Sequence, residues 1–402
     1  MRILIALTYY RPHYSGLTIY TERVACTLAE RGHQVTVLTS RFDETLAPRE
    51  VYNGVQVIRP KVWFHVSKGV IMPSMWLQAW KLVRQSDVVH LHVPQLDAAP
   101  IALMGKLLAR PVVLTYHCDL RLPSGFVHTI ANQVSNLANH ITAMAADVIV
   151  QNSRDYAEHS AFLRPYLKKL RPVYPPVEVS PVSQADLLAF RQTYGLQEGE
   201  RIIGVAARLA TEKGIEYLAQ ALPTVLERFP RAHVLFVGPY QNVVGEEAYA
   251  RRVASLIEPL RDRWSFLGVV SPVEMSAFFH ESEVLVLPSI NSTESFGMVQ
   301  VEAMTCGTPV IATDLPGVRV PVQVTSAGKI VPPRDASALA GALIDVLERP
   351  ADYQGQMEKI VLPSSPEAVT DEYETIFNTL LERKAQDVHK KGDTRSEITE
   401  YR

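Results

Sequence analysis

The amino-acid sequence predicts an α/β protein built from two Rossmann-like domains. Short apolar runs rich in β-branched residues alternate with helical segments, as in parallel sheets that helices cover on both faces. Three prolines within residues 171–176 interrupt this alternation, which then begins again. The length of 402 residues is too great for one ordinary core and suits two domains.

The predicted N-terminal domain covers residues 1–174. A helical pattern at 18–31 follows the first of five apolar runs of strand length, which are 2–8, 34–39, 87–92, 111–116 and 147–151. The opening run is short and lacks a cleavage-like pattern of small residues, so we expect a buried first strand in preference to a signal peptide.

The predicted C-terminal domain covers residues 175–365. A helix is expected at 215–228, and five further runs of strand length are 201–207, 233–238, 265–267, 284–288 and 309–312. Apolar residues then recur at helical spacing over 366–383, and we expect this helix to pack back toward the N-terminal domain. The polar and charged residues 384–402 are predicted to form a disordered tail.

Composition and cysteine usage exclude several classes of protein. Hydrophobic residues make up 47% and charged residues 20% of the chain, as in globular proteins. No apolar run reaches the roughly 18–20 residues that a membrane-spanning helix requires. The three cysteines, Cys26, Cys118 and Cys306, are odd in number and scattered, so neither a disulfide framework nor paired metal ligands is expected. Small thiols in a reducing cytoplasm are the expectation.

Charge is distributed unevenly between the two halves of the chain. Residues 1–174 contain 19 Lys and Arg against 11 Asp and Glu, whereas the remainder contains 21 against 31. Within the basic half, residues 59–84 contain five cations, no acid and four large aromatic side chains. Such a segment suits a peripheral position at the inner face of an anionic membrane or a lipid-linked acceptor. A packed helix with a solvated face is the alternative.

Ligands of open α/β sheets bind at the carboxyl ends of the strands, so the polar residues in those loops are the candidate site. Glu294 lies in the loop after the run at 284–288, and a helix is expected to begin at Phe296-Gly297. The helix-start amides of four residues are expected to point at an anion: Phe296, Gly297, Met298 and Val299. Glu302, one to two turns into the helix, suits a ribose diol. The alternative is an acidic capping loop on a surface helix.

Two cations follow the first strand of the C-terminal half. Arg208 and Lys213 lie where a strand ends and a helix begins, at a predicted carboxyl-end loop. A guanidinium and an ammonium group at this place are suited to neutralise a diphosphate and to stabilise the charge on a departing nucleoside diphosphate. Simple solvation of both cations is the alternative.

These segments resemble the family 4 retaining glycosyltransferases. The resemblance covers nearly the whole chain and rests on the spacing from Glu294 to Glu302, on Glu302-Ala-Met-x-x-Gly-x-Pro-Val, and on Arg208-Leu-x-x-x-Lys213-Gly. It implies a GT-B fold, in which two Rossmann-like domains face each other across a cleft. It also implies net retention at the anomeric carbon of a nucleotide-sugar donor, with Glu294 nearer the sugar.

The resemblance extends to the N-terminal half. His117, at the end of the run 111–116, corresponds to a histidine that contacts the donor sugar, and Asp119 is a weaker neighbour. Relatives usually carry a Gly-Gly pair where this chain has Ser15-Gly16, so only Gly16 is carried over as a donor-binding residue. His90 and His92 lie on the same face of a strand. We expect them to pack at the strand end or His92 to contact the acceptor substrate. A metal site is not expected, because no third ligand is available.

The expected activity is therefore sugar transfer to a hydroxyl group of a glycan, glycolipid or lipid-linked acceptor. A UDP-sugar is favoured on frequency, with GDP-mannose second. No metal, other cofactor or nucleic-acid partner is expected, and the lack of an Asp-x-Asp triplet argues against metal-dependent GT-A enzymes. A GT-B nucleotide-sugar epimerase and a non-catalytic nucleotide-sugar-binding protein remain alternatives. A nicotinamide-dependent oxidoreductase is not favoured, because Gly-x-Gly-x-x-Gly is absent after the first strand of each half.

Overall fold

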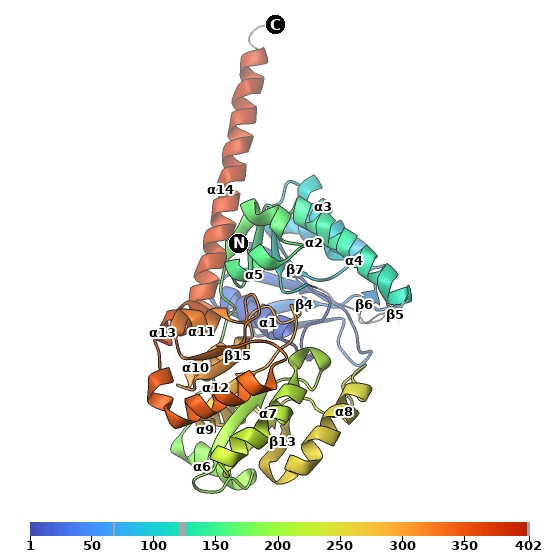
Figure 1. Ribbon diagram of the computed structural model, residues 1–402. Helices are drawn as coiled ribbons and strands as arrows, with labels where there is room; N and C mark the ends of the chain where they lie inside the picture. The colour runs from blue at the N-terminus through green and yellow to red at the C-terminus, as the bar shows by residue number, and fades with distance from the viewer. Residues whose placement is uncertain (67–68, 120–125, 400–402) are drawn as a thin grey trace. The chain divides into compact units, whose positions relative to one another are not determined.

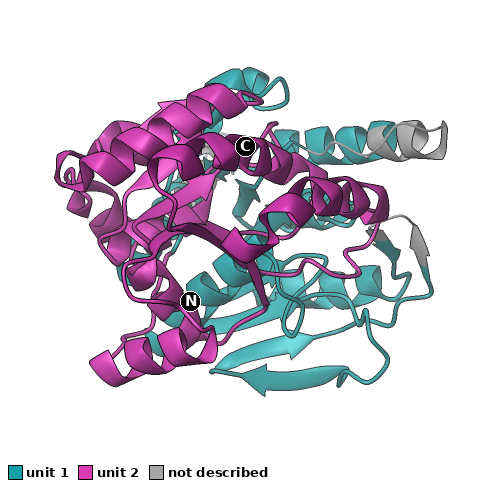
Figure 2. Ribbon diagram, turned by 60° about the horizontal axis from the view of Figure 1, so that its bottom comes forward, with its two compact units in different colours: residues 1–176, 366–402 teal, residues 177–365 magenta. Residues whose placement is uncertain are grey.

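The structure, a computed structural model, describes residues 1–66, 69–119 and 126–399 and contains two compact units. Unit 1 comprises Met1–Pro176 and Pro366–Arg402, and unit 2 comprises Val177–Ser365 (Figure 2). The chain therefore leaves unit 1 at the proline-rich segment, two residues beyond the predicted boundary at 174, and its last helix belongs to unit 1 again.

Unit 1 contains an eight-stranded sheet with the order β10-β9-β8-β7-β1-β2-β4-β3. The strands are β1 (Arg2–Ala6), β2 (Gln34–Leu38), β3 (Arg49–Tyr52), β4 (Val55–Ile58), β7 (Val88–Val93), β8 (Val112–Tyr116), β9 (Val148–Gln151) and β10 (Leu170–Pro172). All neighbours pair in parallel except β3 and β4, which form a hairpin at one edge. Its Asn53-Gly54 turn has positive φ at both residues, as hairpin turns of this length favour.

The helices of unit 1 cover both faces of this sheet (Figure 1). They are α1 (Gly16–Glu30), α2 (Met75–Gln85), α3 (Ala98–Leu107), α4 (Phe126–Ala145), α5 (Arg154–His159) and α14 (Pro366–Thr399), with a 3₁₀ turn at Arg164–Lys169 and a small hairpin of β5 (Phe64–Val66) and β6 (Gly69–Ile71). Apolar side chains from one sheet face, such as Leu91 and Leu114, pack in one core with residues of α2, α3, α4 and α5. The opposite face contains His90, His92 and Thr115, because successive strand residues alternate in direction.

Helix α14 is held to the rest of unit 1 by apolar packing and by polar contacts. Its buried residues recur every three or four positions, namely Val369, Tyr373, Ile376, Phe377 and Leu380. The buried Tyr373 hydroxyl lies 2.7 Å from the hydroxyl of Tyr20 in α1 and 2.8 Å from the Thr115 Oγ1 in β8. Arg31 forms ion pairs with Asp371 and Glu374 at 2.5 and 2.8 Å.

The helix also differs from the sequence prediction at its C-terminal end. In place of a disordered tail over 384–402, α14 continues to Thr399, and residues 400–402 lie outside the described part of the chain. The continuation has a physical basis, because residues 384–399 contain no proline and extend a helix whose preceding turns are already packed.

Unit 2 contains a six-stranded sheet with the order β13-β12-β11-β14-β15-β16. The strands, all paired in parallel, are β11 (Arg201–Ala206), β12 (Ala232–Val237), β13 (Trp264–Gly268), β14 (Val284–Leu287), β15 (Val310–Thr313) and β16 (Gly328–Val331). In chain order this is 3-2-1-4-5-6, the order of a dinucleotide-binding Rossmann sheet. The connections diverge in opposite directions from the neighbouring strands β11 and β14.

Some helices of unit 2 pack against the sheet in its main hydrophobic core, and others lie outside this core. They are α6 (Gln184–Thr193), α7 (Ile215–Arg228), α8 (Glu247–Ile257), α9 (Pro272–Glu281), α10 (Met298–Thr305), α11 (Val320–Thr325), α12 (Ala336–Glu348) and α13 (Glu358–Val361), with 3₁₀ turns at Thr211–Lys213, Glu258–Arg263, Pro350–Tyr353 and Leu362–Ser364. Residues of α7, α8 and α12 pack with Val205 and Phe236 of the sheet in one core. Gly204 of β11 accommodates α9 on the other face, because a Cβ atom there would lie 2.9 Å from the Phe278 ring.

The contacts of Tyr373 predict a measurable contribution to the stability of unit 1. Replacing Tyr373 by Phe removes the hydroxyl that lies between Tyr20 and Thr115 while it keeps the ring. We expect the free energy of unfolding to fall by about 1–3 kcal/mol, since buried polar groups lose a partner. Urea denaturation followed by circular dichroism measures this, with the exposed Glu372→Gln on the same helix as control. Equal stability of Tyr373→Phe and the control would contradict the role.

Candidate functional site

The predicted donor-site residues of unit 2 lie in the loops at the carboxyl ends of β11 and β14 and in helix α10, which follows the second loop. These two strands are neighbours, and the chain leaves them toward opposite edges of the sheet. Ligands of open α/β sheets bind at such a switch point, because the diverging loops leave room beyond the strand ends. The loops are residues 207–214 after β11 and 288–297 after β14.

A side-chain ion pair and a backbone hydrogen bond join the two loops. The Lys213 ammonium lies 2.5 Å from the Glu294 Oε2, and both side chains are mostly buried, with exposed fractions of 20% and 15%. The Ile290 amide donates to the Glu212 carbonyl at 3.0 Å. Gly214 permits this approach, since its φ is 64° and a Cβ atom would lie 2.2 Å from the Pro288 carbonyl oxygen. The tertiary structure thus brings together two residues that the sequence separates by 81 positions.

Arg208 has an acidic partner that the sequence analysis did not single out. Its Nη2 lies 2.6 Å from the Glu212 Oε1, and the arginine side chain remains 46% exposed. An ion pair this exposed contributes little stability, so the guanidinium can exchange Glu212 for another anion at low cost. The two residues lie four positions apart in the same loop.

The loop after β12 supports the same segment. Both the backbone amide and the hydroxyl of Thr211 donate to the Glu246 Oε2, at 3.0 and 2.7 Å. Thr211 is the first residue of the 3₁₀ turn that ends at Lys213. Glu246 therefore helps to hold the turn that carries Lys213, and sequence reasoning missed it because the two positions are 35 residues apart.

The start of α10 is a tight and rigid turn. Gly297, the residue before the helix, has φ 78°, and a Cβ atom there would lie 2.4 Å from the Leu287 Cδ2. Gln300 donates through its side-chain amide to the carbonyl oxygens of Phe296 and Val318 at 2.7 and 2.9 Å. Only 1% of Phe296 is exposed, so any contact it makes with a donor is through its backbone.

Helix geometry makes this turn a candidate anion site. Met298 and Val299 are the first two residues of α10, where helix geometry offers their amides no acceptor in a preceding turn, and the helix dipole favours negative charge at this end. Glu302 lies farther along α10 and is partly exposed.

Burial and the neighbouring Glu302 raise the pKa of the Cys306 thiol to about 12, so this cysteine is a neutral thiol near pH 7.

Two of the predicted residues of unit 1 are neighbouring histidines, His92 in β7 and His117 directly after β8. His117 Nε2 lies 2.9 Å from the His92 Nδ1, and the two ring planes are nearly parallel, 18° apart. His92 is 1% exposed, whereas His117 is partly exposed. Burial lowers the pKa of His117 to about 3 and that of His92 well below its usual value, so both imidazoles are neutral at pH 7. The structure therefore shows His92 in contact with the candidate catalytic histidine.

Asp119 and Gly16 occupy loops at the same edge of the unit 1 sheet. The hydroxyls of Tyr116 and Ser160 donate to the Asp119 Oδ1 at 2.9 and 2.7 Å, which fixes the carboxylate. Gly16 is the first residue of α1, and Ser15 caps this helix by accepting from the Thr18 amide at 3.2 Å. The loop after β1 thus ends at a helix N-terminus.

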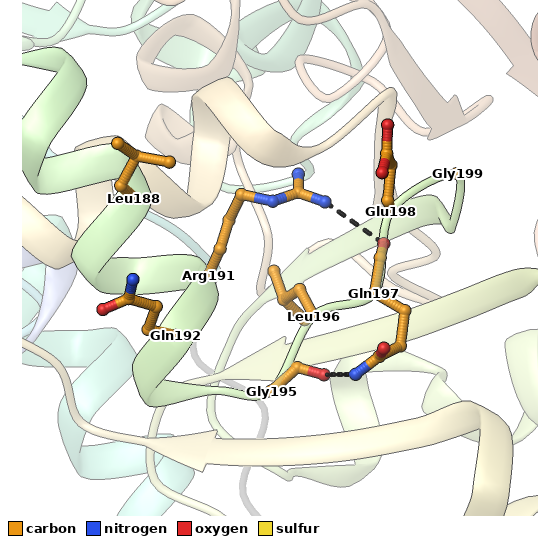
Figure 3. A pocket seen from close by; sticks show the side chains of 8 residues that line it. All are labelled: Leu188, Arg191, Gln192, Gly195, Leu196, Gln197, Glu198 and Gly199. Carbon is orange, nitrogen blue, oxygen red and sulfur yellow. Dashed lines mark hydrogen bonds between the residues drawn. The ribbon is translucent and has the colours of Figure 1, made fainter.

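Two further features do not add to the candidate site. Among residues 1–66, 69–119 and 126–399, no group of three or more His, Cys, Asp and Glu side chains is placed to hold a metal ion. Figure 3 shows a hollow lined by residues 188, 191, 192 and 195–199, where Arg191 donates to the Gln197 carbonyl at 3.1 Å. These residues precede β11, whereas the donor-site loops follow it, so this hollow lies at the amino ends of the strands.

Comparison with known proteins identifies both units. The profile described as "Glycosyl transferase 4-like domain" matches residues 15–175, and "Glycosyl transferases group 1" matches residues 188–360. A phosphatidyl-myo-inositol mannosyltransferase of Mycolicibacterium smegmatis is 26% identical over 364 residues, which are 87% of this chain and 85% of that protein.

Solved structures show the same fold. Sucrose-phosphate synthase from Thermosynechococcus elongatus aligns with a TM-score of 0.74 at 22% identity, over 95% of this chain and 99% of that chain. HepE of Anabaena, solved in complex with UDP-glucose, aligns with a TM-score of 0.73 at 19% identity, over 94% of this chain and all of that chain.

The geometry of Gly297 predicts how the donor-site turn responds to substitution. Gly297→Ala places a methyl group against Leu287 at a positive φ, whereas Gly307→Ala, at the other end of α10, meets a similar φ of 81° with no heavy atom within 4 Å. We expect backbone strain to lower the free energy of unfolding of both variants by about 1 kcal/mol. Gly297→Ala should be destabilised further by the contact with Leu287, and only this variant should bind nucleotide more weakly. Thermal unfolding measures the stability, and calorimetry measures the binding. Equal behaviour of the two variants would contradict the tight packing of this turn.

The sequence motifs, the two parallel sheets and the profile matches agree in both units. The predicted fold class is confirmed, as is the predicted enzyme class. The chain is a glycosyltransferase of the family 4 type with the GT-B fold.

Proposed function

We propose that this enzyme transfers a sugar from a nucleoside diphosphate sugar to an acceptor hydroxyl with retention at the anomeric carbon. The main support is the convergence of Arg208, Lys213 and the N-terminus of α10 at the carboxyl ends of β11 and β14. Two cations and a helix dipole at one strand edge are suited to a diphosphate.

Donor binding in this proposal exchanges the partners of both cations. Lys213 and Arg208 are paired with Glu294 and Glu212. A diphosphate carries more negative charge than one carboxylate and offers several acceptor oxygens, so it can replace both acids. Glu294, released from Lys213, would then be available to accept hydrogen bonds from sugar hydroxyl groups. Glu302 on α10 would accept from the ribose diol.

The chemical step that we propose is a front-side displacement. The acceptor oxygen forms a bond to the anomeric carbon while the bond from that carbon to the diphosphate oxygen breaks. The acceptor proton moves to the departing diphosphate oxygen, and Arg208, Lys213 and the α10 amides stabilise its charge. Catalysis then depends on positioning and electrostatic stabilisation. A neutral His117 fits a role as a hydrogen-bonding contact to the donor sugar.

Two relatives suggest donors. HepE of Anabaena was solved with UDP-glucose, which supports a UDP-sugar as the first candidate. The Mycolicibacterium smegmatis relative is a mannosyltransferase, which keeps GDP-mannose as the second. That relative's name also includes a phosphatidylinositol, and a lipid-linked acceptor is the corresponding proposal for this chain.

Helix α2 supports a peripheral membrane contact by unit 1. It buries Met75, Ala79 and Val83 and exposes Trp76, Leu77 and Trp80, which are 55%, 80% and 37% exposed. The neighbouring Lys81 and Arg84 are also exposed. Large apolar residues flanked by cations suit the headgroup region of an anionic bilayer.

Not every cation of the basic segment 59–84 belongs to the exposed face. Arg59 is buried at 2% exposure and pairs with Glu50 at 2.6 Å, so it is a structural cation and not part of the exposed face. Lys68 lies outside the described residues. In the part of the chain that the structure describes, no helix is long and apolar enough to cross a membrane.

The donor proposal predicts a large effect of removing Lys213. With Lys213→Ala we expect kcat/KM to fall about 100- to 1000-fold, as when one group that stabilises developing negative charge is lost. The measurement is the release of nucleoside diphosphate and glycosylated product from UDP-, GDP- and ADP-sugars. Lys359→Ala, an exposed lysine elsewhere in unit 2, is the control. Near-normal transfer with unchanged donor affinity would exclude this mechanism, and release of an altered nucleotide sugar would indicate an epimerase.

The membrane proposal predicts that α2 determines vesicle binding. The double variant Trp76→Ser with Trp80→Ser should reduce sedimentation with anionic phospholipid vesicles by about tenfold or more, since each large apolar side chain contributes more than about 1 kcal/mol on burial. Val244→Ser removes an apolar side chain of unit 2 that is 80% exposed and serves as control. Unchanged vesicle binding by the double variant would rule out α2 as the contact.

A further inference from the structure

The histidine pair of unit 1 contains a chain of hydrogen bonds whose direction can be assigned. The chain begins on α1, where the Thr21 hydroxyl lies 2.9 Å from the Leu17 carbonyl oxygen. A carbonyl oxygen only accepts, so the single hydroxyl proton of Thr21 points to Leu17, as in many helical threonines. The Thr21 Oγ1 is therefore left as an acceptor toward its second neighbour, the His92 Nδ1 at 3.3 Å.

This direction determines the tautomer of His92. Because Thr21 faces His92 as an acceptor, the His92 Nδ1 must carry a proton to make a hydrogen bond. In the opposite tautomer the His92 Nδ1 could accept only from a protonated His117 Nε2, and two acceptors would face each other at the Thr21 contact. This tautomer would also bury an Nε2–H donor, and among the described residues the His92 Nε2 has no hydrogen-bond partner. A doubly protonated ring is disfavoured because His92 is buried.

The same proton reaches the candidate catalytic histidine. The His92 Nδ1 lies 2.9 Å from the His117 Nε2, so a protonated Nδ1 donates to both Thr21 and His117. The His117 Nε2 is then an acceptor with no proton of its own. In a neutral imidazole the remaining proton lies on Nδ1.

We propose that His92 is a positioning residue that holds His117 in the neutral tautomer protonated at Nδ1. His117 then offers an N–H donor and no free ring lone pair. The catalytic consequence rests on the proposed function. In sugar transfer, His117 would donate a hydrogen bond to an oxygen of the donor sugar and would not act as a general base. The acceptor proton would accordingly go to the departing diphosphate.

The surrounding groups are consistent with a neutral pair. The Tyr20 ring stands edge-on to His117, with centroids 5.1 Å apart, and the His90 ring lies 4.3 Å from that of His92. His90 pairs with Thr115 through its Nε2 at 2.7 Å and so belongs to the hydroxyl network of Tyr373. His90 is buried and neutral, since burial lowers its pKa to about 3. Because His90 is a buried histidine that forms no hydrogen bond with His117, it is a matched control for His92.

The test is nitrogen-15 NMR of histidine-labelled full-length protein, which distinguishes the two neutral tautomers and the cation. At pH 7 we expect His117, assigned by loss of its signals in His117→Gln, to be neutral and protonated at Nδ1. His92→Leu should shift His117 toward the Nε2-protonated form, whereas His92→Asn, whose side-chain amide can replace the Nδ1 donor, should retain the native form. The control His90→Leu should leave the His117 tautomer unchanged.

Activity provides the second readout. We expect His92→Leu to reduce kcat by about tenfold or more, with a smaller change in the KM for the donor, and His92→Asn to restore most of it. Wild-type His117 protonated at Nε2, or charged, would overturn the inference, as would an unchanged tautomer in His92→Leu. An Nδ1-protonated His117 in a protein that transfers no sugar would contradict the proposed function and leave the tautomer assignment supported.

Discussion

The parallel pairing of every strand in unit 2 is the constraint on which its candidate site depends. Parallel strands place all their carboxyl ends at one edge of the sheet, so the loops after β11 and β14 must end close together. Arg208, Lys213, Glu294 and the start of α10 are all attached to these two loops. Close packing then fixes their details, since Gly214 and Gly297 allow backbone approaches that a side chain would block.

The charges at the carboxyl ends of β11 and β14 are paired within unit 2. Each candidate cation already has a carboxylate partner within hydrogen-bonding distance, Glu212 for Arg208 and Glu294 for Lys213. An isolated charge held away from water is unfavourable, and pairing reduces that cost. In the proposed donor complex, a diphosphate would gain affinity only by the difference between its own contacts and those that it displaces.

Unit 1 depends on a different kind of interaction, a buried polar network on one face of its sheet. His90, Thr115, Tyr20 and Tyr373 share hydrogen bonds where helices normally contribute only apolar side chains. Buried polar groups are tolerated when they are paired, and α14 provides one of the required partners. The last helix of the chain is thus part of the same polar layer that contains His92 and His117.

The fold class, the strands at the centre of both sheets and the residue types of the candidate donor site could be predicted from the sequence alone. This was possible because buried parallel strands read as apolar runs and because the spacing from Glu294 to Glu302 is a local property. The strands β3, β4, β10 and β16 were missed, since each is only three or four residues long and β3, β10 and β16 lie at sheet edges, where apolar patterns are weaker. Only the tertiary structure decided the partners of these residues. Glu246, His92 and Tyr373 acquire their contacts through chain segments brought together by packing, and no local pattern records which acceptor a donor will meet.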